Sequence, residues 1–177
     1  MMPARPPPTL VLGGARSGKS AFAARLALAS GLAPVYVATA AALDAEMAAR
    51  IERHRRERGA PWITVEAPDE VAAAIAVWSA PDRFVVVDCL TLWLTQLLTR
   101  GRDPAVAREG LLAALAERRG PVALVSNEVG LGIVPLGELS RRFVDEAGFL
   151  HQAVATIADR VVLLVAGRPL EVGPAPG

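Results

Sequence analysis

Cysteine, lysine, histidine and aromatic residues are scarce in this sequence. Its 177 residues include one cysteine, Cys89, two histidines and 5% aromatic residues. A single cysteine excludes an internal disulfide bond and a cysteine-based zinc site, and it favours a reducing compartment, so we expect a cytoplasmic protein. Apolar residues make up 53% of the chain, but Asp88 and many arginines interrupt them before the ~18 residues that a membrane-spanning helix needs. We therefore predict no insertion into a membrane.

A large excess of charge of either sign is absent as well. The formal net charge is +1 and the isoelectric point is about 8.0, which gives no general reason to expect a nucleic acid or a membrane surface as partner. Residues 1–8 include four prolines and one arginine and no apolar stretch, so we expect a flexible proline-rich lead there rather than a signal peptide. The remaining residues, 9–177, fit a single domain.

The most informative stretch is rich in glycine. Residues 13–20 read GGARSGKS, follow an apolar run and open a helical pattern near Gly18. They match G-x-x-x-x-G-K-[ST], in which backbone N–H groups and a helix N-terminus hold phosphates, the lysine reaches the β- and γ-phosphates, and the last hydroxyl binds Mg²⁺. We predict that a nucleoside triphosphate is bound by Gly13, Gly14, Ala15, Arg16, Ser17, Gly18, Lys19 and Ser20, with Ser20 as a ligand of Mg²⁺.

An accidental match at a glycine-rich turn between a strand and a helix is the alternative. Composition argues against it, because eighteen of the nineteen basic residues are arginine and Lys19 is the only lysine. A phosphate-binding loop needs a compact ammonium group at this position rather than a planar guanidinium. The only lysine in the chain thus occupies the position where the motif requires one.

Strand-like and helix-like segments alternate along the chain. Buried parallel strands are usually continuous β-branched runs, and such runs occur at Leu10–Leu12, Val35–Ala38, Phe84–Val87, Val122–Val125 and Val161–Val165. Helical patterns follow Gly18, Glu70 and Asp103-Pro104, and an apolar stripe from Leu139 to Ile157 predicts a longer helix in which Gly148 could introduce a break. The alternation predicts an α/β fold with a mostly parallel central sheet flanked by helices.

Two of these runs end in polar residues. Ligands of open α/β sheets bind at the carboxyl ends of the strands, so Asp88 takes the place of a Walker B aspartate that holds Mg²⁺ opposite Ser20. A helix-capping role for Asp88 is the alternative. Glu128, after the run 122–125, either orients a substrate hydroxyl or metal-bound water, or caps a loop. We expect His151, near the apolar stripe, to be packed in the structure and assign it no chemistry.

The segment from Leu43 to Arg58 combines an apolar face with a cluster of arginines. Leu43, Met47 and Ile51 share one helical face, which His54 continues, and residues 50–58 hold five arginines against two glutamates. One interpretation is a solvated amphipathic helix with a chance histidine. The other is an anion site in which a neutral imidazole attacks phosphorus while arginines stabilise the departing group. The pattern alone leaves both open.

Together these motifs resemble one known family. The resemblance is carried by the glycine-rich stretch, Tyr36–Ala40, Glu46–Arg55, Trp62–Glu66, Val87–Thr91 and Ser126–Pro135. The last of these, together with the pattern Arg50-Ile51-x-x-His54-Arg55, is far more specific than a phosphate-binding loop. Over nearly its whole length after the proline-rich lead, the chain is similar to the bifunctional adenosylcobinamide kinases / adenosylcobinamide-phosphate guanylyltransferases of cobalamin biosynthesis.

The resemblance implies a RecA-like P-loop fold, a homotrimer and two activities. The first phosphorylates adenosylcobinamide with ATP or GTP in the presence of Mg²⁺. The second transfers GMP from GTP to that phosphate through a guanylylated histidine, which by its position in the motif is His54, and Lys19 is the second catalytic residue. The implied nucleotide contacts outside the glycine-rich stretch are Ala38, Thr39, Ala40, Arg55, Arg56, Glu57, Arg58, Glu66 and Asp88.

Other functions fit the sequence less well. A GTPase switch would need a second lysine in its guanine-reading motif N-K-x-D, and the chain has none. A RecA-like ATPase acting on nucleic acid would be favoured by aromatic residues for base stacking, which the arginine cluster lacks. A small-molecule kinase without the transferase activity is the closest alternative, and the sequence does not distinguish ATP from GTP in the kinase step.

Overall fold

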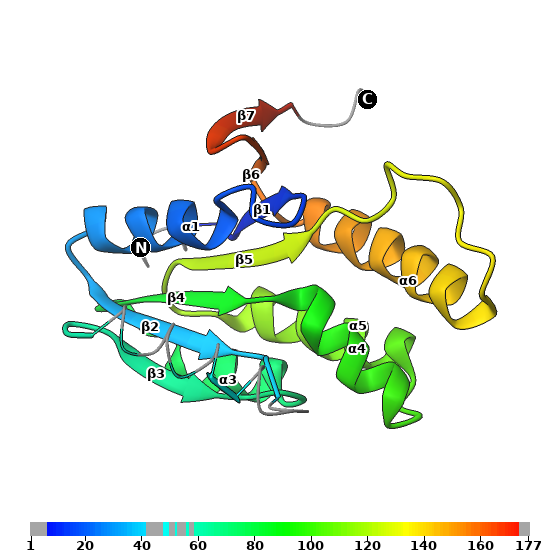
Figure 1. The fold of residues 1–177 in the computed structure, drawn as a ribbon. Helices are drawn as coiled ribbons and strands as arrows, with labels where there is room; N and C mark the ends of the chain where they lie inside the picture. Colours follow the sequence, from blue (N-terminus) through cyan, green and yellow to red (C-terminus); the bar gives the residue numbers. More distant parts are fainter. Residues whose placement is uncertain (1–6, 42–47, 50–51, 53–55, 57–58, 174–177) are drawn as a thin grey trace.

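The computed structural model describes residues 7–41, 48–49, 52, 56 and 59–173, so most of the predicted proline-rich lead lies outside it. Within these ranges the chain forms a seven-stranded sheet with the order β3-β2-β4-β5-β1-β6-β7, which Figure 1 shows from the lower edge to the upper one. The strands are β1 (Thr9–Gly13), β2 (Ala33–Ala38), β3 (Ile63–Glu66), β4 (Arg83–Asp88), β5 (Val122–Asn127), β6 (Arg160–Val165) and β7 (Arg168–Val172).

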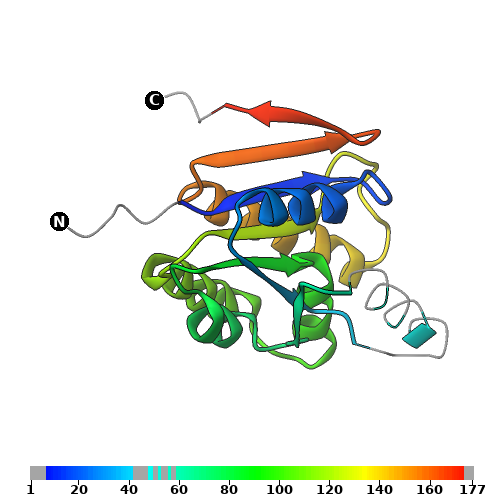
Figure 2. The ribbon, with the colours of Figure 1, turned by 90° about the vertical axis from the view of Figure 1, so that its left-hand side faces the viewer.

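The predicted mostly parallel sheet is confirmed. All neighbouring strands from β3 to β6 pair in parallel, and only β7 runs antiparallel to its neighbour, as the opposed orange and red arrows in Figure 2 show. Each of the five predicted runs lies within a strand. The two strands at the edges, β3 and β7, were not predicted, because neither contains a buried residue. Pro169 in β7 has no backbone N–H to donate. It is tolerated there because β7 is an edge strand, so no hydrogen bond between inner strands is lost.

Helices cover both faces of the sheet because side chains alternate along each strand. On one face α1 (Lys19–Ala29) packs its residues Phe22, Ala23 and Ala27 against Val11, Val86 and Val125. The opposite face, built from residues such as Leu10, Val85 and Leu124, is covered by α3 (Val71–Trp78), α4 (Leu90–Thr99), α5 (Pro104–Glu117) and α6 (Glu138–Ala155). None of the helices in the described ranges is long and apolar enough to span a membrane.

The longest of these helices is α6, and it differs in part from its predicted pattern. It continues through Gly148 without a break, and a Cβ at that position would meet no atom within 4 Å. Its buried residues are Ala147, Leu150, His151 and Val154, whereas Leu139 in its first turn is 60% exposed. Burial of the central turns outweighs the propensity cost of one glycine, about 1 kcal/mol. The sheet is therefore packed against the middle and end of α6 rather than its first turn.

Candidate nucleotide-binding site

The candidate site follows from the parallel pairing, which brings the carboxyl ends of six strands to one edge. The register places Gly13 at the end of β1 beside Asn127 at the end of β5. It also places Ala38 at the end of β2 between Asp88 on β4 and Glu66 on β3. Predicted site residues from four separate parts of the sequence (Gly13, Ala38, Glu66 and Asp88) therefore lie along one edge of the sheet.

The turn from β1 to α1 is shaped by its first and last glycines. Gly13 has φ 155° and Gly18 has φ 96°, both in the region that favours glycine. A Cβ on Gly13 would also lie 2.7 Å from the carbonyl oxygen of Leu164. Gly18 precedes α1 without any side-chain cap, so N–H groups at the start of this helix point into the loop, where an anion can accept from them.

Lys19 lies under this loop. Its Nζ donates to the carbonyl oxygen of Gly14 at 2.7 Å, and the residue is 7% exposed. Burial lowers the pKa of Lys19, whereas the nearby groups of Cys89 and Asp88 act in the opposite direction. The lysine is therefore close to the aspartate at the end of β4, with its ammonium group held by a main-chain oxygen that a phosphate can replace.

Ser17 lies in the same loop. Its Oγ is buried and is the one such side-chain N or O atom in the described ranges without a hydrogen-bond partner. The carbonyl oxygen of Ser17 accepts from the N–H of Gly167 at 2.9 Å, in the turn between β6 and β7. The hairpin at the sheet edge thus supports the glycine-rich loop from outside.

Asp88 is oriented by a strand neighbour. Its Oδ2 accepts from the hydroxyl group of Tyr36 at 2.6 Å, whereas the start of α4, at Cys89, has no side-chain cap. The capping alternative for Asp88 is therefore not what the structure shows. No local pattern in the sequence indicates this role of Tyr36, because the pairing of β2 with β4 cannot be inferred from either strand alone.

Polar residues around Asp88 fix the main chain that follows it. Thr39 Oγ1 donates to the carbonyl oxygen of Cys89 at 2.7 Å, and the N–H of Cys89 donates back to Thr39 Oγ1 at 2.6 Å. Asn127 Nδ2 donates to Thr91 Oγ1 at 3.0 Å, and Thr91 in turn is joined to the sulfur of Cys89 at 2.8 Å. Burial raises the pKa of the Cys89 thiol, and the charge of Asp88 acts in the same direction. The thiol thus stays protonated and serves as a packed polar group.

The end of β5 carries a second polar cluster. His151 is buried, as expected, and a hydrogen bond of 2.7 Å joins its Nε2 to Ser126 Oγ. Its Nδ1 lies 3.9 Å from Glu128 Oε2. Glu128 Oε1 accepts from the N–H of Gly130 at 2.6 Å, so the loop-capping role predicted as one alternative is present. The hydrogen bond between His151 and Ser126 has no signal in the sequence, because it depends on how α6 crosses the sheet.

The arginine-rich segment is described only in part. His54, Arg55, Glu57 and Arg58 lie outside the described residues, so the predictions for them are not tested by the structure. Arg56 is exposed and its Nε is 3.0 Å from Glu52 Oε1, one helical turn earlier. The structure therefore assembles the glycine-rich loop, Ala38–Ala40, Glu66 and Asp88, and leaves the remaining predicted contacts as predictions.

The residues present fit Mg²⁺ as it usually binds beside phosphates. A cluster of three or more His, Cys, Asp or Glu side chains suited to a metal is not found in the part of the chain that the structure describes. Mg²⁺ commonly takes only one or two protein oxygens and completes its shell with water and phosphate. The hydroxyl of Ser20 and the carboxylate of Asp88 are hard oxygen donors of this kind.

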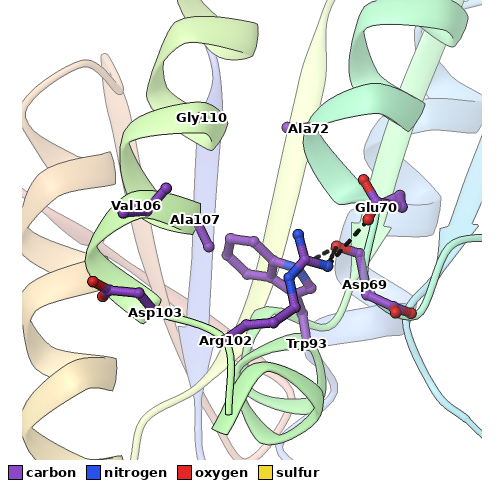
Figure 3. Close-up of a pocket in the computed structure, with 9 residues that line it drawn as sticks. All are labelled: Asp69, Glu70, Ala72, Trp93, Arg102, Asp103, Val106, Ala107 and Gly110. Carbon is purple, nitrogen blue, oxygen red and sulfur yellow. Dashed lines mark hydrogen bonds and ion pairs between the residues drawn. The ribbon is translucent and has the colours of Figure 1, made fainter. Parts of the chain in front are cut away.

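Two hollows lie away from the glycine-rich loop. One, of about 350 Å³, lies between α3, α4 and α5, where Trp93 Nε1 donates to the carbonyl oxygen of Asp69 and Arg102 pairs with Glu70 (Figure 3). The other, of about 410 Å³, is an apolar groove between α4 and α6 that is lined in part by Val129, Leu139 and Phe143. None of their lining residues belongs to the stretch 13–20.

Comparison with known proteins identifies the family. Residues 9–172 match the family described as cobinamide kinase / cobinamide phosphate guanyltransferase. The chain belongs to this family. The resemblance stated from its motifs is thereby confirmed, and so are the enzyme class and the P-loop α/β fold that it implied. This cobinamide kinase / guanyltransferase carries the glycine-rich loop and Asp88 on the sheet edge described above.

Individual relatives agree over nearly their whole length. The bifunctional adenosylcobalamin biosynthesis protein CobP of Pseudomonas aeruginosa is 56% identical over 164 residues, which cover 91% of this chain and 94% of the relative. The bifunctional adenosylcobalamin biosynthesis proteins CobU of Salmonella typhimurium and Escherichia coli are 42% and 40% identical, each covering 89% of this chain and 95% of the relative.

Solved structures with a similar chain path are more distant. The P4 protein from bacteriophage phi6 in complex with ADP has a TM-score of 0.47 and 17% identity, covering 92% of this chain and 52% of that one. The RadB recombinase has a TM-score of 0.46 and 17% identity, covering 89% of this chain and 73% of that one.

Proposed function

We propose that this family member phosphorylates the hydroxyl group of adenosylcobinamide with ATP or GTP, and then transfers GMP from GTP to the new phosphate to give adenosylcobinamide-GDP. The observation that supports this most is the complete phosphate-binding loop, with Lys19 under it and Asp88 nearby, in a chain of this family. One nucleotide site of this kind can serve both steps, because each begins with a bound triphosphate.

In the kinase step the loop holds the triphosphate. N–H groups from Gly13 to Ser20 and the N-terminus of α1 bind phosphate oxygens, and the ammonium group of Lys19 exchanges the carbonyl oxygen of Gly14 for the β- and γ-phosphates. Ser20 and Asp88 would hold Mg²⁺, which would neutralise the charge that develops on the phosphates. The corrinoid hydroxyl attacks the γ-phosphorus and the nucleoside diphosphate leaves.

In the transferase step His54 is the nucleophile. Its imidazole attacks the α-phosphorus of GTP, pyrophosphate leaves, and the phosphate of the acceptor then displaces the histidine. Splitting the transfer in this way replaces the direct encounter of two large anions with two easier displacements. In this proposal the nucleotide is also contacted by Ala38, Thr39, Ala40, Arg55, Arg56, Glu57, Arg58 and Glu66.

The proposal includes the setting in which the enzyme works. We assign it to the cytoplasm as a homotrimer without a nucleic-acid partner. The buried thiol of Cys89, the only cysteine in the sequence, is compatible with a reducing compartment, and the trimer rests on the family resemblance.

Replacing the lysine tests this function. Lys19→Ala should abolish phosphorylation of adenosylcobinamide while the circular dichroism spectrum and the melting temperature stay close to those of the parent, because the lysine binds phosphate. Lys19→Arg should also fail badly, since the larger planar group does not fit the loop. A folded Lys19→Ala protein with near-normal phosphorylation would refute the assignment.

A further inference from the structure

Glu128 is a carboxylate at the edge of the phosphate-binding loop that the proposed mechanism does not use. Its backbone N–H donates to the carbonyl oxygen of Gly13 at 2.9 Å, so the residue is fixed directly to the start of the loop. The side chain is 20% exposed. Val129, the next residue, lines the apolar groove between α4 and α6. Glu128 therefore lies between the phosphate-binding loop and an open groove.

The groups behind Glu128 are buried and hold no charge to pair with it. Ser126 is fully buried, which prevents it from acting as a nucleophile, and its Oγ is joined to His151 Nε2. Burial lowers the pKa of His151, with Glu128 acting in the opposite direction, so the imidazole is neutral near pH 7. Its Nδ1 is 3.9 Å from Glu128 Oε2, which is too far for a hydrogen bond. This imidazole is the titratable group that the structure places beside Glu128 at ion-pair distance, within the described residues.

A carboxylate in this position has few possible roles. It repels phosphate oxygens, so it does not bind the nucleotide directly. Its Oε1 already accepts from the N–H of Gly130, but each carboxylate oxygen has two lone pairs, so acceptor capacity is left on both. A hydroxyl group that attacks phosphorus must lose its proton, and none of the residues in the proposed mechanism receives it.

We infer that Glu128 is a catalytic residue of the phosphorylation step, in which it accepts the proton of the attacking corrinoid hydroxyl. The inference rests on the proposed function. As the bond from the hydroxyl oxygen to the γ-phosphorus forms, the bond from that phosphorus to the bridging oxygen of the nucleotide breaks. The hydroxyl proton passes to a carboxylate oxygen of Glu128 and later to water. His151 and Ser126 are positioning residues that form the wall behind the carboxylate.

The two activities of the enzyme provide an internal control. The acceptor of the phosphorylation step is a neutral hydroxyl, whereas the acceptor of the transferase step is a phosphate that is already ionised and has no proton to lose. The formation of a histidine–GMP bond needs no proton acceptor at Glu128 either. Loss of the carboxylate should therefore impair the first step selectively.

The test is Glu128→Gln, with Glu138→Gln as the matched control at the exposed start of α6. Glutamine keeps an oxygen that accepts from the N–H of Gly130, so the loop cap is retained and only the base is lost. We expect kcat for phosphorylation of adenosylcobinamide to fall at least about 100-fold. GMP transfer to preformed adenosylcobinamide phosphate and the melting temperature should match those of Glu138→Gln and the parent.

Three results would overturn the inference. If Glu128→Gln retains its phosphorylation rate, Glu128 has no role in that step. If the variant loses both activities equally, the role of Glu128 is structural. If its phosphorylation rate recovers when the Mg²⁺ concentration is raised, Glu128 binds the metal. If the parent protein itself does not phosphorylate adenosylcobinamide, the proposed function fails first, which is a distinct outcome from failure of the variant alone.

Discussion

The most consequential single contact at the site joins Tyr36 to Asp88. The two residues are 52 positions apart, and the hydroxyl group of one orients the carboxylate of the other. A predicted metal ligand that is fixed in this way needs less reorganisation when the ion binds, since its rotamer is already restricted.

Removing this hydroxyl group tests the metal role of Asp88. Tyr36→Phe keeps the buried ring, so the fold should persist, but the concentration of Mg²⁺ that gives half the maximal kinase rate should rise about 10-fold. Asp88→Asn should have a larger effect on the same titration. Asp82→Asn, an exposed carboxylate beside the opposite end of β4, is the control. An unchanged Mg²⁺ dependence in Asp88→Asn would contradict the metal role.

The roles of some site residues could be predicted from the sequence, and those of others could not. Lys19 and Ser20 lie in one continuous motif, so their spacing was enough to predict a phosphate-binding loop. Tyr36 and the pair Ser126–His151 act through contacts between distant segments, which no local pattern contains. The sequence could therefore indicate that His151 is packed, but not what it packs against.

At the scale of elements, the junction of β1 and α1 depends on a backbone that only glycine adopts easily. Gly13 has a positive φ, and its added Cβ would lie 2.5 Å from Ser17 Oγ and 2.7 Å from the carbonyl oxygen of Leu164, whereas a Cβ on Gly14 would meet nothing within 4 Å. These neighbouring glycines form a matched pair for mutation.

We predict that Gly13→Ala disrupts the loop and Gly14→Ala does not. Gly13→Ala should lower the free energy of unfolding by more than about 1 kcal/mol and weaken nucleotide binding at least about 10-fold. Chemical denaturation and calorimetric titration with a nucleoside triphosphate would measure both. Equal stability of the two variants would show that the strain at Gly13 does not shape the loop.

Burial decides which strands and helices could be predicted from the sequence. The inner strands are buried on both faces and appear as continuous apolar runs, which is why the segments around Val86 and Leu124 were predicted correctly. β3 and β7 are short and partly or fully exposed, so hydrophobic pattern gives little signal for them. In α6, Leu139 belongs to the apolar stripe but remains exposed, because the helix extends beyond the sheet it covers.

At the scale of the whole molecule, the order of strands creates the site. β5 lies between β1 and β4 in the sheet, so its end, with Asn127, lies between the strand that leads into the glycine-rich loop and the strand that ends in Asp88. The sequence predicted the strands that carry these residues but not their order, because pairing is set by packing between elements that are far apart in the chain. The residues at this edge of the sheet could thus be predicted from the sequence, whereas their arrangement beside one another depends on the fold.

Stability of the whole molecule should depend on the buried imidazole of His151. Burial lowers its pKa below the usual value of 6.5, so the unfolded chain takes up a proton at a higher pH than the folded one. This contribution to stability is complete above about pH 6.5 and is lost as the pH falls below it. When the pH is lowered from about 7.5 to about 5, the free energy of unfolding should fall less in His151→Gln than in the parent. Urea denaturation at each pH measures this free energy. Identical pH dependence in both proteins would contradict a neutral, buried His151.

Labelling with GTP tests the central claim, two activities with a guanylylated histidine, most directly. The protein is incubated with Mg²⁺ and GTP labelled at the α-phosphate or, separately, at the γ-phosphate. We predict covalent label from the α-phosphate only, with release of pyrophosphate, in a bond that is labile to acid and stable to base. His54→Asn should abolish the label and GMP transfer while keeping much of the kinase activity. Label that persists in His54→Asn, or none in the parent, would contradict the account.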